Sequence, residues 1–322
     1  MERQLFCKGY TWGAFSRSGM YQTKQAQESM TRLAENGLDW ICIPVNAYQE
    51  SYMSTMVHPV YGRTQTDDDV IFAINYAKKL GLKVCLKPMV DTMDGVWRAR
   101  ISFPEESRVD YCDRWFGSYL QFMLHYAAIA EKTGCEMLCT GCELDGMDMN
   151  AKRCLNMISE VRKVYSGLLM HNINHGDEFK YSWLSAVDVI GISAYYRLTD
   201  GIDVSYEKMM ESWARVKERL VKAHEKYGRP IMFAEIGIRN EHGCSAYPYD
   251  FKHRADVALD EDEQADFYRS ALESFWDEEW FRGYFWWDWK AILTPEDKIH
   301  ENRDFTCYGK KAETVLREWY TK

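Results

Sequence analysis

Short, almost continuously apolar segments alternate with longer amphipathic segments along the whole chain. The short segments have the length and composition of strands buried on both faces, because hydrophobic side chains occupy consecutive positions instead of every second one. These predicted strands comprise residues 5–10, 40–45, 83–87, 136–143, 168–173, 187–194, 231–235 and 283–287.

The longer segments carry the start and stop signals of helices. An acidic run at residues 67–69 suits a helix N-terminus, and a basic pair at 78–79 suits the C-terminus of the same helix, because each charge opposes the helix dipole. Glycines such as Gly134 and Gly228 follow other segments and tolerate the positive φ of a helix end. The predicted helices comprise residues 23–36, 67–80, 114–132, 151–165, 179–185, 205–227, 261–277 and 310–319, of which 179–185 has the weakest pattern.

This alternation predicts βαβ units and a parallel sheet. Eight repeats within 322 residues favour an α/β fold closed into a (β/α)8 TIM barrel over an open, doubly wound sheet. No Pro/Gly-rich linker or charge block interrupts the pattern, so residues 1–322 are predicted to form a single domain. No GxGxxG follows the first strand and no GxxxxGK[ST] occurs, so nothing indicates a nucleotide cofactor.

Composition narrows the classes of partner. The formal net charge of −9 argues against nucleic acid, whose phosphates are bound by Lys and Arg. No apolar run approaches the roughly 20 residues of a membrane-spanning helix. The first residues lack the features of a signal peptide, so we expect a cytoplasmic protein that contacts no membrane. The 10 cysteines are then expected to be free thiols.

Aromatic residues make up 15% of the chain, with 12 Trp and 21 Tyr. A Trp-rich core would explain this content. A carbohydrate cleft would explain it equally well, because aromatic faces cover the apolar C–H faces of sugar rings while their polar edges form hydrogen bonds.

Two carboxylates each end an otherwise apolar predicted strand. Glu143 ends the fourth strand and Glu235 ends the seventh. Catalytic groups of such barrels lie at the C-terminal ends of the strands, and strands separated by three steps face each other across the mouth. Each Glu alone is explained by an ion pair at the rim, since an unpaired buried carboxylate is costly. Two of them together favour a paired site.

A carboxyl pair suits cleavage of a glycosidic bond. One group must be protonated to assist the leaving oxygen, and the other must be ionised to attack the anomeric carbon. A separation of about 5–5.5 Å would retain the configuration through a covalent glycosyl-enzyme. Unequal burial and mutual repulsion would hold the two pKa values apart.

Several stretches, spread in order over nearly the whole chain, carry a resemblance to a known family. They are Lys8-Gly-Tyr-Thr-Trp-Gly13, Tyr61-Gly-Arg-Thr64, Gly81-Leu-Lys-Val-Cys-Leu-Lys-Pro88, Val90-Asp91, Asp94-Gly-Val-Trp-Arg98, Gly141-Cys-Glu-Leu144, Phe233-Ala-Glu-Ile-Gly237 and Gly309-Lys-Lys-Ala-Glu-Thr-Val-Leu-Arg-Glu-Trp-Tyr320. With Glu at the ends of strands four and seven, the chain resembles the retaining glycosidases of clan A. It is similar in particular to glycoside hydrolase family 113, known mainly for β-mannanases.

The resemblance implies roles for individual residues. Glu143 would be the general acid/base and Glu235 the nucleophile. A tyrosine of strand six would hydrogen-bond the nucleophile and keep it ionised; we favour Tyr195 and keep Tyr196 open. Trp287 of strand eight would form the floor under the sugar that is cleaved.

The chain also departs from the clan. Most members have Asn before the acid/base, where it binds the sugar 2-hydroxyl, but this chain has Cys142. Many relatives have an Arg at the end of strand two, and none is found here. The group that contacts the 2-hydroxyl therefore stays open, with four candidates. They are Asn46, Lys87, Asp91 and Asn172.

Trp12, at the end of the first strand, and Trp97 complete the predicted substrate-binding set. The CxxC formed by Cys139 and Cys142 lies on a predicted strand, not at a helix N-terminus, which disfavours redox use. No second ligand pair completes a zinc site. We therefore expect neither a metal nor a cofactor.

The predicted function is hydrolysis of β-1,4-mannosidic bonds in mannan or manno-oligosaccharides by double displacement. An exo-β-mannosidase or another β-glycosidase would use the same barrel and the same chemistry. A non-catalytic carbohydrate-binding barrel is the alternative from another class, although a pure binder does not need both Glu143 and Glu235. A metal-dependent barrel hydrolase lacks support, because no His/Asp cluster occurs at the strand ends.

Overall fold

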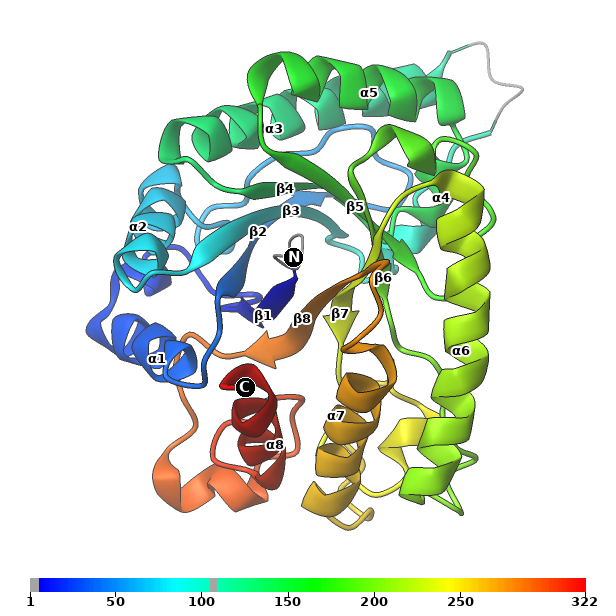
Figure 1. Cartoon of the computed structure of the whole chain (residues 1–322). Coiled ribbons are helices and arrows are strands. Elements are labelled where there is room, and N and C mark those ends of the chain that lie inside the picture. The colour runs from blue at the N-terminus through cyan, green and yellow to red at the C-terminus, as the bar shows by residue number, and fades with distance from the viewer. Residues whose placement is uncertain (1–5, 105–108) are drawn as a thin grey trace.

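The computed structural model describes residues 6–104 and 109–322, which form a closed barrel of parallel strands surrounded by helices. In Figure 1 the strands form the inner ring, and the helices lie outside it. Strands β1 to β8 pair in chain order, and β8 closes the barrel against β1. The predicted (β/α)8 fold is confirmed. None of the described helices is both long enough and apolar enough to cross a membrane.

The strands agree with the apolar segments of the sequence. Their bounds are β1 Cys7–Trp12, β2 Trp40–Gln49, β3 Lys83–Thr92, β4 Met137–Cys142, β5 Leu168–Asn174, β6 Val189–Ser193, β7 Ile231–Ile236 and β8 Phe281–Trp289. Residue 5 of the first predicted strand lies outside the described residues.

The helices are α1 Lys24–Ala34, α2 Asp67–Lys79, α3 Tyr111–Thr133, α4 Asp145–Asp148, α5 Ala151–Val164, α6 Tyr206–Tyr227, α7 Glu261–Phe275 and α8 Lys311–Tyr320. Local sequence fixes several ends. At α2 the Thr66 hydroxyl accepts from the Asp69 N–H while the Asp69 carboxylate accepts from the Thr66 N–H, which satisfies two backbone donors at once. Gly134 and Gly228 end α3 and α6 in the left-handed conformation, as predicted.

Strands β2 and β3 run further than their apolar cores. Their pairing continues from Trp40 opposite Lys83 to Gln49 opposite Thr92. An antiparallel bridge between Tyr48 and His58 borders this extension. The sequence pattern ended these strands at residues 45 and 87, where Asn46 follows the one and Pro88 the other. Both strands continue past these residues, and the extension of β3 carries Asp91 up to the mouth of the barrel.

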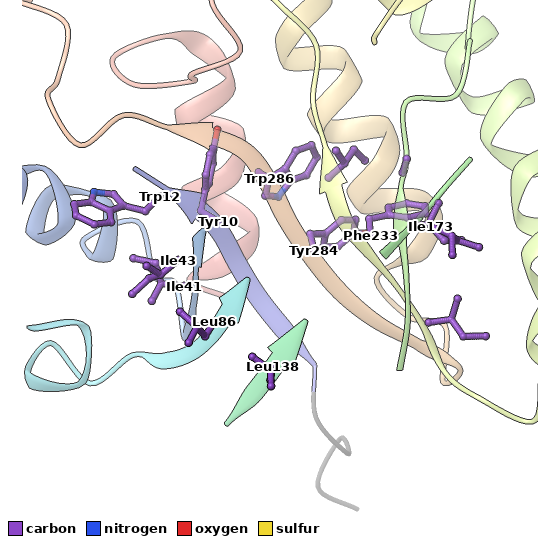
Figure 2. Close-up of a cluster of buried hydrophobic side chains, with 14 of the residues drawn as sticks. Tyr10, Trp12, Ile41, Ile43, Leu86, Leu138, Ile173, Phe233, Tyr284 and Trp286 are labelled. Atoms are coloured by element: carbon purple, nitrogen blue, oxygen red, sulfur yellow. The ribbon is translucent and has the colours of Figure 1, made fainter. Parts of the chain in front are cut away.

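Alternation along each strand divides the core in two. Ile41 and Ile43 point outward into the layer between strands and helices, shown in Figure 2, whereas Trp40 and Cys42 point into the barrel. The interior cluster consists of Cys7, Trp40, Cys42, Cys85, Met137, Cys139, Met170, Val189, Met232, Ala234 and Phe285. Cysteine and methionine side chains thus fill much of the narrow interior beneath the mouth.

The predicted helix at residues 179–185 is wrong. Only a 3-10 turn, η3 Leu184–Ala186, forms in this connection. Tyr181 and Trp183 are both buried while the residue between them is exposed, and this spacing does not match one face of an α-helix. The Glu178 carboxylate accepts from the Gly176 N–H at 2.9 Å and fixes the preceding turn instead.

Two glycines with positive φ test how tightly the barrel closes. Gly81 (φ +83°) has open space where a Cβ would lie, whereas a Cβ on Gly283 (φ +99°) would come within 2.2 Å of the Cys7 carbonyl oxygen. We expect Gly81→Ala to cost about 1 kcal/mol of unfolding free energy, the penalty of the left-handed conformation alone. Gly283→Ala should cost distinctly more, because a strand must also move. Equal losses in denaturant unfolding would contradict this account of the β1–β8 closure.

Candidate active site

A cavity of about 1060 Å³ opens at the carboxyl ends of the strands. Glu143 and Glu235 both line it, together with Tyr195 and Trp287. Aromatic side chains from the end of β2 and from several loops extend its walls. They are Phe15, Tyr48, Trp97, Tyr247, Tyr249 and Phe251.

Glu235, on β7, is 4% exposed and is held by several donors. Lys87 Nζ lies 2.5 Å from its Oε1, and the Cys142 thiol lies 3.3 Å from the same oxygen. The Asn172 amide reaches it at 3.5 Å, and the Tyr195 hydroxyl donates to Oε2 at 3.1 Å. Burial acts to raise the pKa of Glu235, but the charge and hydrogen bond of Lys87, together with the charge of Arg98 and the hydrogen bond of Cys142, hold that pKa below its ordinary value. Glu235 is therefore ionised at neutral pH.

Lys87 is the cation that makes this burial possible. It lies on β3, its side chain is fully buried, and its contacts reach across the barrel interior to β7. An ion pair without solvent is stable only if both partners are present, because either charge alone would be desolvated without compensation. Lys87 is thus paired with Glu235, and its side chain is not exposed in the cavity.

Glu143 follows the last residue of β4 in a left-handed backbone conformation, with φ of +55°. Its N–H donates to the Asn172 carbonyl at 2.9 Å. Its Oε2 accepts from the Trp97 indole at 3.2 Å and from Arg98 Nη1 at 3.1 Å. Burial raises the pKa of Glu143, the negative charge of Glu235 raises it further, and Arg98 opposes both.

The two carboxyl groups therefore have pKa values displaced in opposite directions. One favours the protonated form and the other the ionised form at the same pH. This is the arrangement that an acid and a nucleophile, or an acid and a base, require of two chemically identical side chains.

The structure distinguishes the two tyrosines that follow strand six. Tyr195 donates to Glu235, whereas Tyr196 donates to Glu178, which lies in the connection between β5 and β6. Tyr195 is also the one that lines the cavity. Tyr196 lines a separate, smaller pocket beside α6.

The other predicted substrate-binding residues divide into two groups. Trp97, Asp91 and Trp287 line the cavity, and the Trp97 side chain is half exposed. Asn46 lies behind Asp91, to which it donates at 2.9 Å, and is 1% exposed.

Trp12 is placed outside the cavity. Its ring packs against Tyr21 with centroids 4.8 Å apart, and its indole N–H donates to Ser29 at 3.3 Å. Figure 2 shows it in the layer between strands and helices. Trp12 is an aromatic residue at the end of β1, as expected for a sugar contact, but the alternation of side chains along the strand turns it outward.

The two cysteines of the CxxC serve different purposes. The Cys142 thiol donates to Glu235, whereas the Cys139 thiol donates to the Gly141 carbonyl at 3.1 Å. No disulfide joins any of the described cysteines. The Cys142 sulfur also accepts a hydrogen bond from the Asn172 amide at 3.2 Å, so Cys142 belongs to the group of side chains that surround Glu235.

Sequence reasoning missed Arg98 as a site residue. It lies directly after Trp97 in the 3-10 helix η2 Arg98–Arg100 and contacts Asp91 as well as Glu143. The stretch Asp94-Gly-Val-Trp-Arg98 was a signal for it, because it carries an aromatic and a cation side by side in the loop after a barrel strand.

The long loop between β7 and α7 was missed as well. It contributes Tyr247, Tyr249 and Phe251, which are 39%, 50% and 74% exposed. Within the loop, Arg239 Nη1 pairs with Glu241 at 2.7 Å. The Glu263 carboxylate of α7 accepts from two backbone N–H groups of the loop. The alternating aromatics of this loop, after a strand that ends in a carboxylate, were the signal available in the sequence.

The chain is similar to known proteins over nearly its whole length. A family model described as Glycoside Hydrolase Family 113 matches residues 10–310. The chain is similar to a solved structure described as a GH113 β-1,4-mannanase, with 34% identity, 99% of each chain covered and a TM-score of 0.91. It is similar to the GH113 β-mannanase AaManA from Alicyclobacillus acidocaldarius in complex with ManMIm, with 34% identity, 98% and 97% covered and a TM-score of 0.90.

More distant structures share only the fold. A β-D-glucuronidase from Dictyoglomus thermophilum has 14% identity and a TM-score of 0.64, with all of this chain but 51% of that chain covered. No match was found among the curated proteins.

Removal of Lys87 tests the buried ion pair. We expect Lys87→Met to lower the free energy of unfolding by about 3–5 kcal/mol, because Glu235 would remain buried without a counter-charge. Lys163→Met, which breaks an exposed pair with Glu160, is the matched control and should cost about 0.5 kcal/mol or less. The double variant Lys87→Met/Glu235→Gln should recover part of the loss. A similar small cost for Lys87→Met and Lys163→Met in denaturant unfolding would refute the pairing.

Proposed function

The chain belongs to glycoside hydrolase family 113, and on that premise we propose that it hydrolyses β-1,4-mannosidic bonds in mannan or manno-oligosaccharides by double displacement. In this proposal Glu143 is the general acid/base and Glu235 is the nucleophile. The observation that carries it is the pair of buried carboxyl groups that open into one cavity with oppositely displaced pKa values.

The first step forms a glycosyl-enzyme. A carboxylate oxygen of Glu235 attacks the anomeric carbon, and the bond from that carbon to the leaving oxygen breaks. Glu143 gives its proton to the leaving oxygen. Lys87 and Tyr195 hold the nucleophile in place and keep it ionised beforehand. Trp287 provides an apolar face for the sugar ring that is attacked.

The second step releases the sugar. Glu143, now ionised, takes a proton from a water molecule while the water oxygen attacks the anomeric carbon. The bond to Glu235 breaks, and both carboxyl groups return to their starting states. Arg98 and the Trp97 indole both donate to the ionised form of Glu143 in this step.

The aromatic lining of the cavity favours endo action on a chain of several sugars. Exposed aromatics line it from two loops, with Trp97 after β3 and with Tyr249 and Phe251 after β7. Such surfaces match successive pyranose rings. The relatives with 34% identity are described as β-mannanases, which favours mannose as the sugar. An exo-β-mannosidase is the alternative that uses the same two carboxyl groups.

Cys142 bears on where the enzyme works. Its thiol must remain reduced to donate to Glu235. This fits the cytoplasmic location expected from the sequence and imported oligosaccharides as the substrate. An axial 2-hydroxyl, as in mannose, is compatible with the replacement of the clan's Asn by Cys142.

Hydrolysis of mannohexaose tests substrate and roles together. We expect wild type to cleave mannohexaose and to leave cellohexaose and xylohexaose intact. Glu143→Ala should lower kcat/KM by roughly 10²- to 10⁴-fold, the share of general acid catalysis. Glu235→Ala should abolish turnover, because no covalent intermediate can form.

Asp145→Asn serves as the matched control, since Asp145 is a nearby carboxylate that bonds Asn174 and does not line the cavity. It should keep most of the activity. Product lengths separate endo from exo action, because an exo enzyme releases a single unit first. Cleavage that survives in both Glu variants would refute the assignment.

The stereochemistry of the first product tests the double displacement. Two successive inversions retain the β configuration, so proton NMR should detect the β-anomer of the new reducing end before mutarotation. Initial appearance of the α-anomer would show a single displacement and would exclude Glu235 as a covalent nucleophile.

A further inference from the structure

Arg98 is shared between two carboxylates in the cavity wall. Its Nη2 and Nε lie 2.6 and 3.0 Å from Asp91 Oδ1, and its Nη1 lies 3.1 Å from Glu143 Oε2. The Arg98 side chain is only about 9% exposed, so water screens these contacts little. Asp91 is in turn bonded through Oδ2 to the Asn46 amide at 2.9 Å. The four residues form one continuous polar row.

This row raises a conflict for a general acid. The first chemical step needs a proton on Glu143, yet a guanidinium in direct contact favours its ionised form. The second step needs the opposite, since Glu143 must then act as a base. A cation of fixed strength beside Glu143 would help one step and hinder the other. Asp91 changes this balance, because it binds the same guanidinium by two hydrogen bonds from the other side.

We propose that Asp91 and Arg98 act as a pair of positioning residues that set the proton affinity of Glu143. Asp91 offsets the charge of the guanidinium, so that Glu143 keeps its proton until the first step. Arg98 stabilises the carboxylate that remains after Glu143 has given up that proton. This inference rests on the proposed function, since it takes Glu143 as the acid/base. It assigns to Arg98 a role that the sequence alone did not predict.

The other groups that face Glu143 either raise or lower its pKa or carry no charge. From β7, Glu235 repels a second negative charge, but Lys87 of β3 pairs with it and weakens that repulsion. Tyr195 and Cys142 are neutral, because burial raises the pKa of each well above its ordinary value. Trp97 donates a neutral N–H. Arg98 is therefore the cation in direct contact with Glu143 among the described residues.

The alkaline limb of the kcat/KM profile against pH reports loss of the proton from free-enzyme Glu143. Arg98→Gln removes the cation and leaves Asp91 as an uncompensated negative charge, so the limb should move to higher pH by about one unit or more. Asp91→Asn leaves the cation facing Glu143 alone, so the limb should move to lower pH by roughly half a unit to one unit. In the double variant the limb should lie between those of the two single variants.

Three controls keep the measurement specific. The acid limb, which reports Glu235, should move less than the alkaline limb in every variant, because Lys87 is untouched and Arg98 makes no hydrogen bond to Glu235 and acts on it through charge alone. Lys290→Gln, which removes a cavity cation paired with Asp288 and not with Glu143, should leave the alkaline limb where it is. A dinitrophenyl mannoside, whose leaving group needs no proton, should show no alkaline limb in the glycosylation step.

Opposite displacements of the alkaline limb by the two variants would establish the pair. A lower kcat with an unmoved limb, or displacement in the same direction, would overturn the proposal and leave Arg98 a structural role. Arg98→Lys keeps the charge without the forked contact and should move the limb less than Arg98→Gln; it also replaces that variant if Arg98→Gln does not fold.

Azide separates this inference from the function on which it rests. In Glu143→Ala, azide should restore turnover of the dinitrophenyl mannoside by attacking the glycosyl-enzyme in place of activated water. Rescue without the opposite pH shifts refutes only the role of Asp91 and Arg98. Absence of rescue refutes Glu143 as the acid/base and the inference with it.

Discussion

A buried ion pair between strands that do not touch organises the mouth of this barrel. Lys87 reaches from β3 to Glu235 on β7 with neither side chain more than 5% exposed. Such a pair requires that every remaining donor and acceptor be satisfied. The thiol of Cys142 and the hydroxyl of Tyr195 fill that requirement at Glu235. The positions of β3, β4, β6 and β7 relative to each other are thereby tied to one carboxylate.

The same constraint separates two identical side chains by function. Glu235 is surrounded by donors and by a full positive charge, whereas Glu143 faces Glu235 and a cation already shared with Asp91. Neither carboxyl differs from the other in covalent structure. Burial acts to raise both pKa values, and the displacements are opposite because positive charges and donors outweigh burial at Glu235, whereas the charge of Glu235 adds to burial at Glu143. The division of labour is thus a property of the tertiary structure.

The sequence predicted the periodic features well. Buried strands and capped helices follow from local patterns, so the barrel and the strand ends that bear Glu143 and Glu235 were within reach. The helix at residues 179–185 was not, because burial of Tyr181 and Trp183 overrode a weak local preference. Trp12 was misplaced because a strand-end position does not tell to which face a side chain turns.

Contacts between distant segments were the other part that sequence could not supply. Lys87 was one of several candidates for a sugar contact, and only the closed barrel commits it to Glu235. Arg98 was visible within a motif, but its position between two carboxylates depends on how the loop after β3 folds back over β4.

The left-handed backbone at Glu143 has a consequence for the stability of the fold. A side chain with a Cβ at φ of +55° is strained by about 1–2 kcal/mol relative to glycine in the same place. A glycine at this position would relax that strain, but Arg98 would lose one of its two carboxylate partners and the Trp97 indole would lose its acceptor. The contacts that prepare Glu143 for chemistry therefore also hold the chain in a conformation that its backbone alone disfavours.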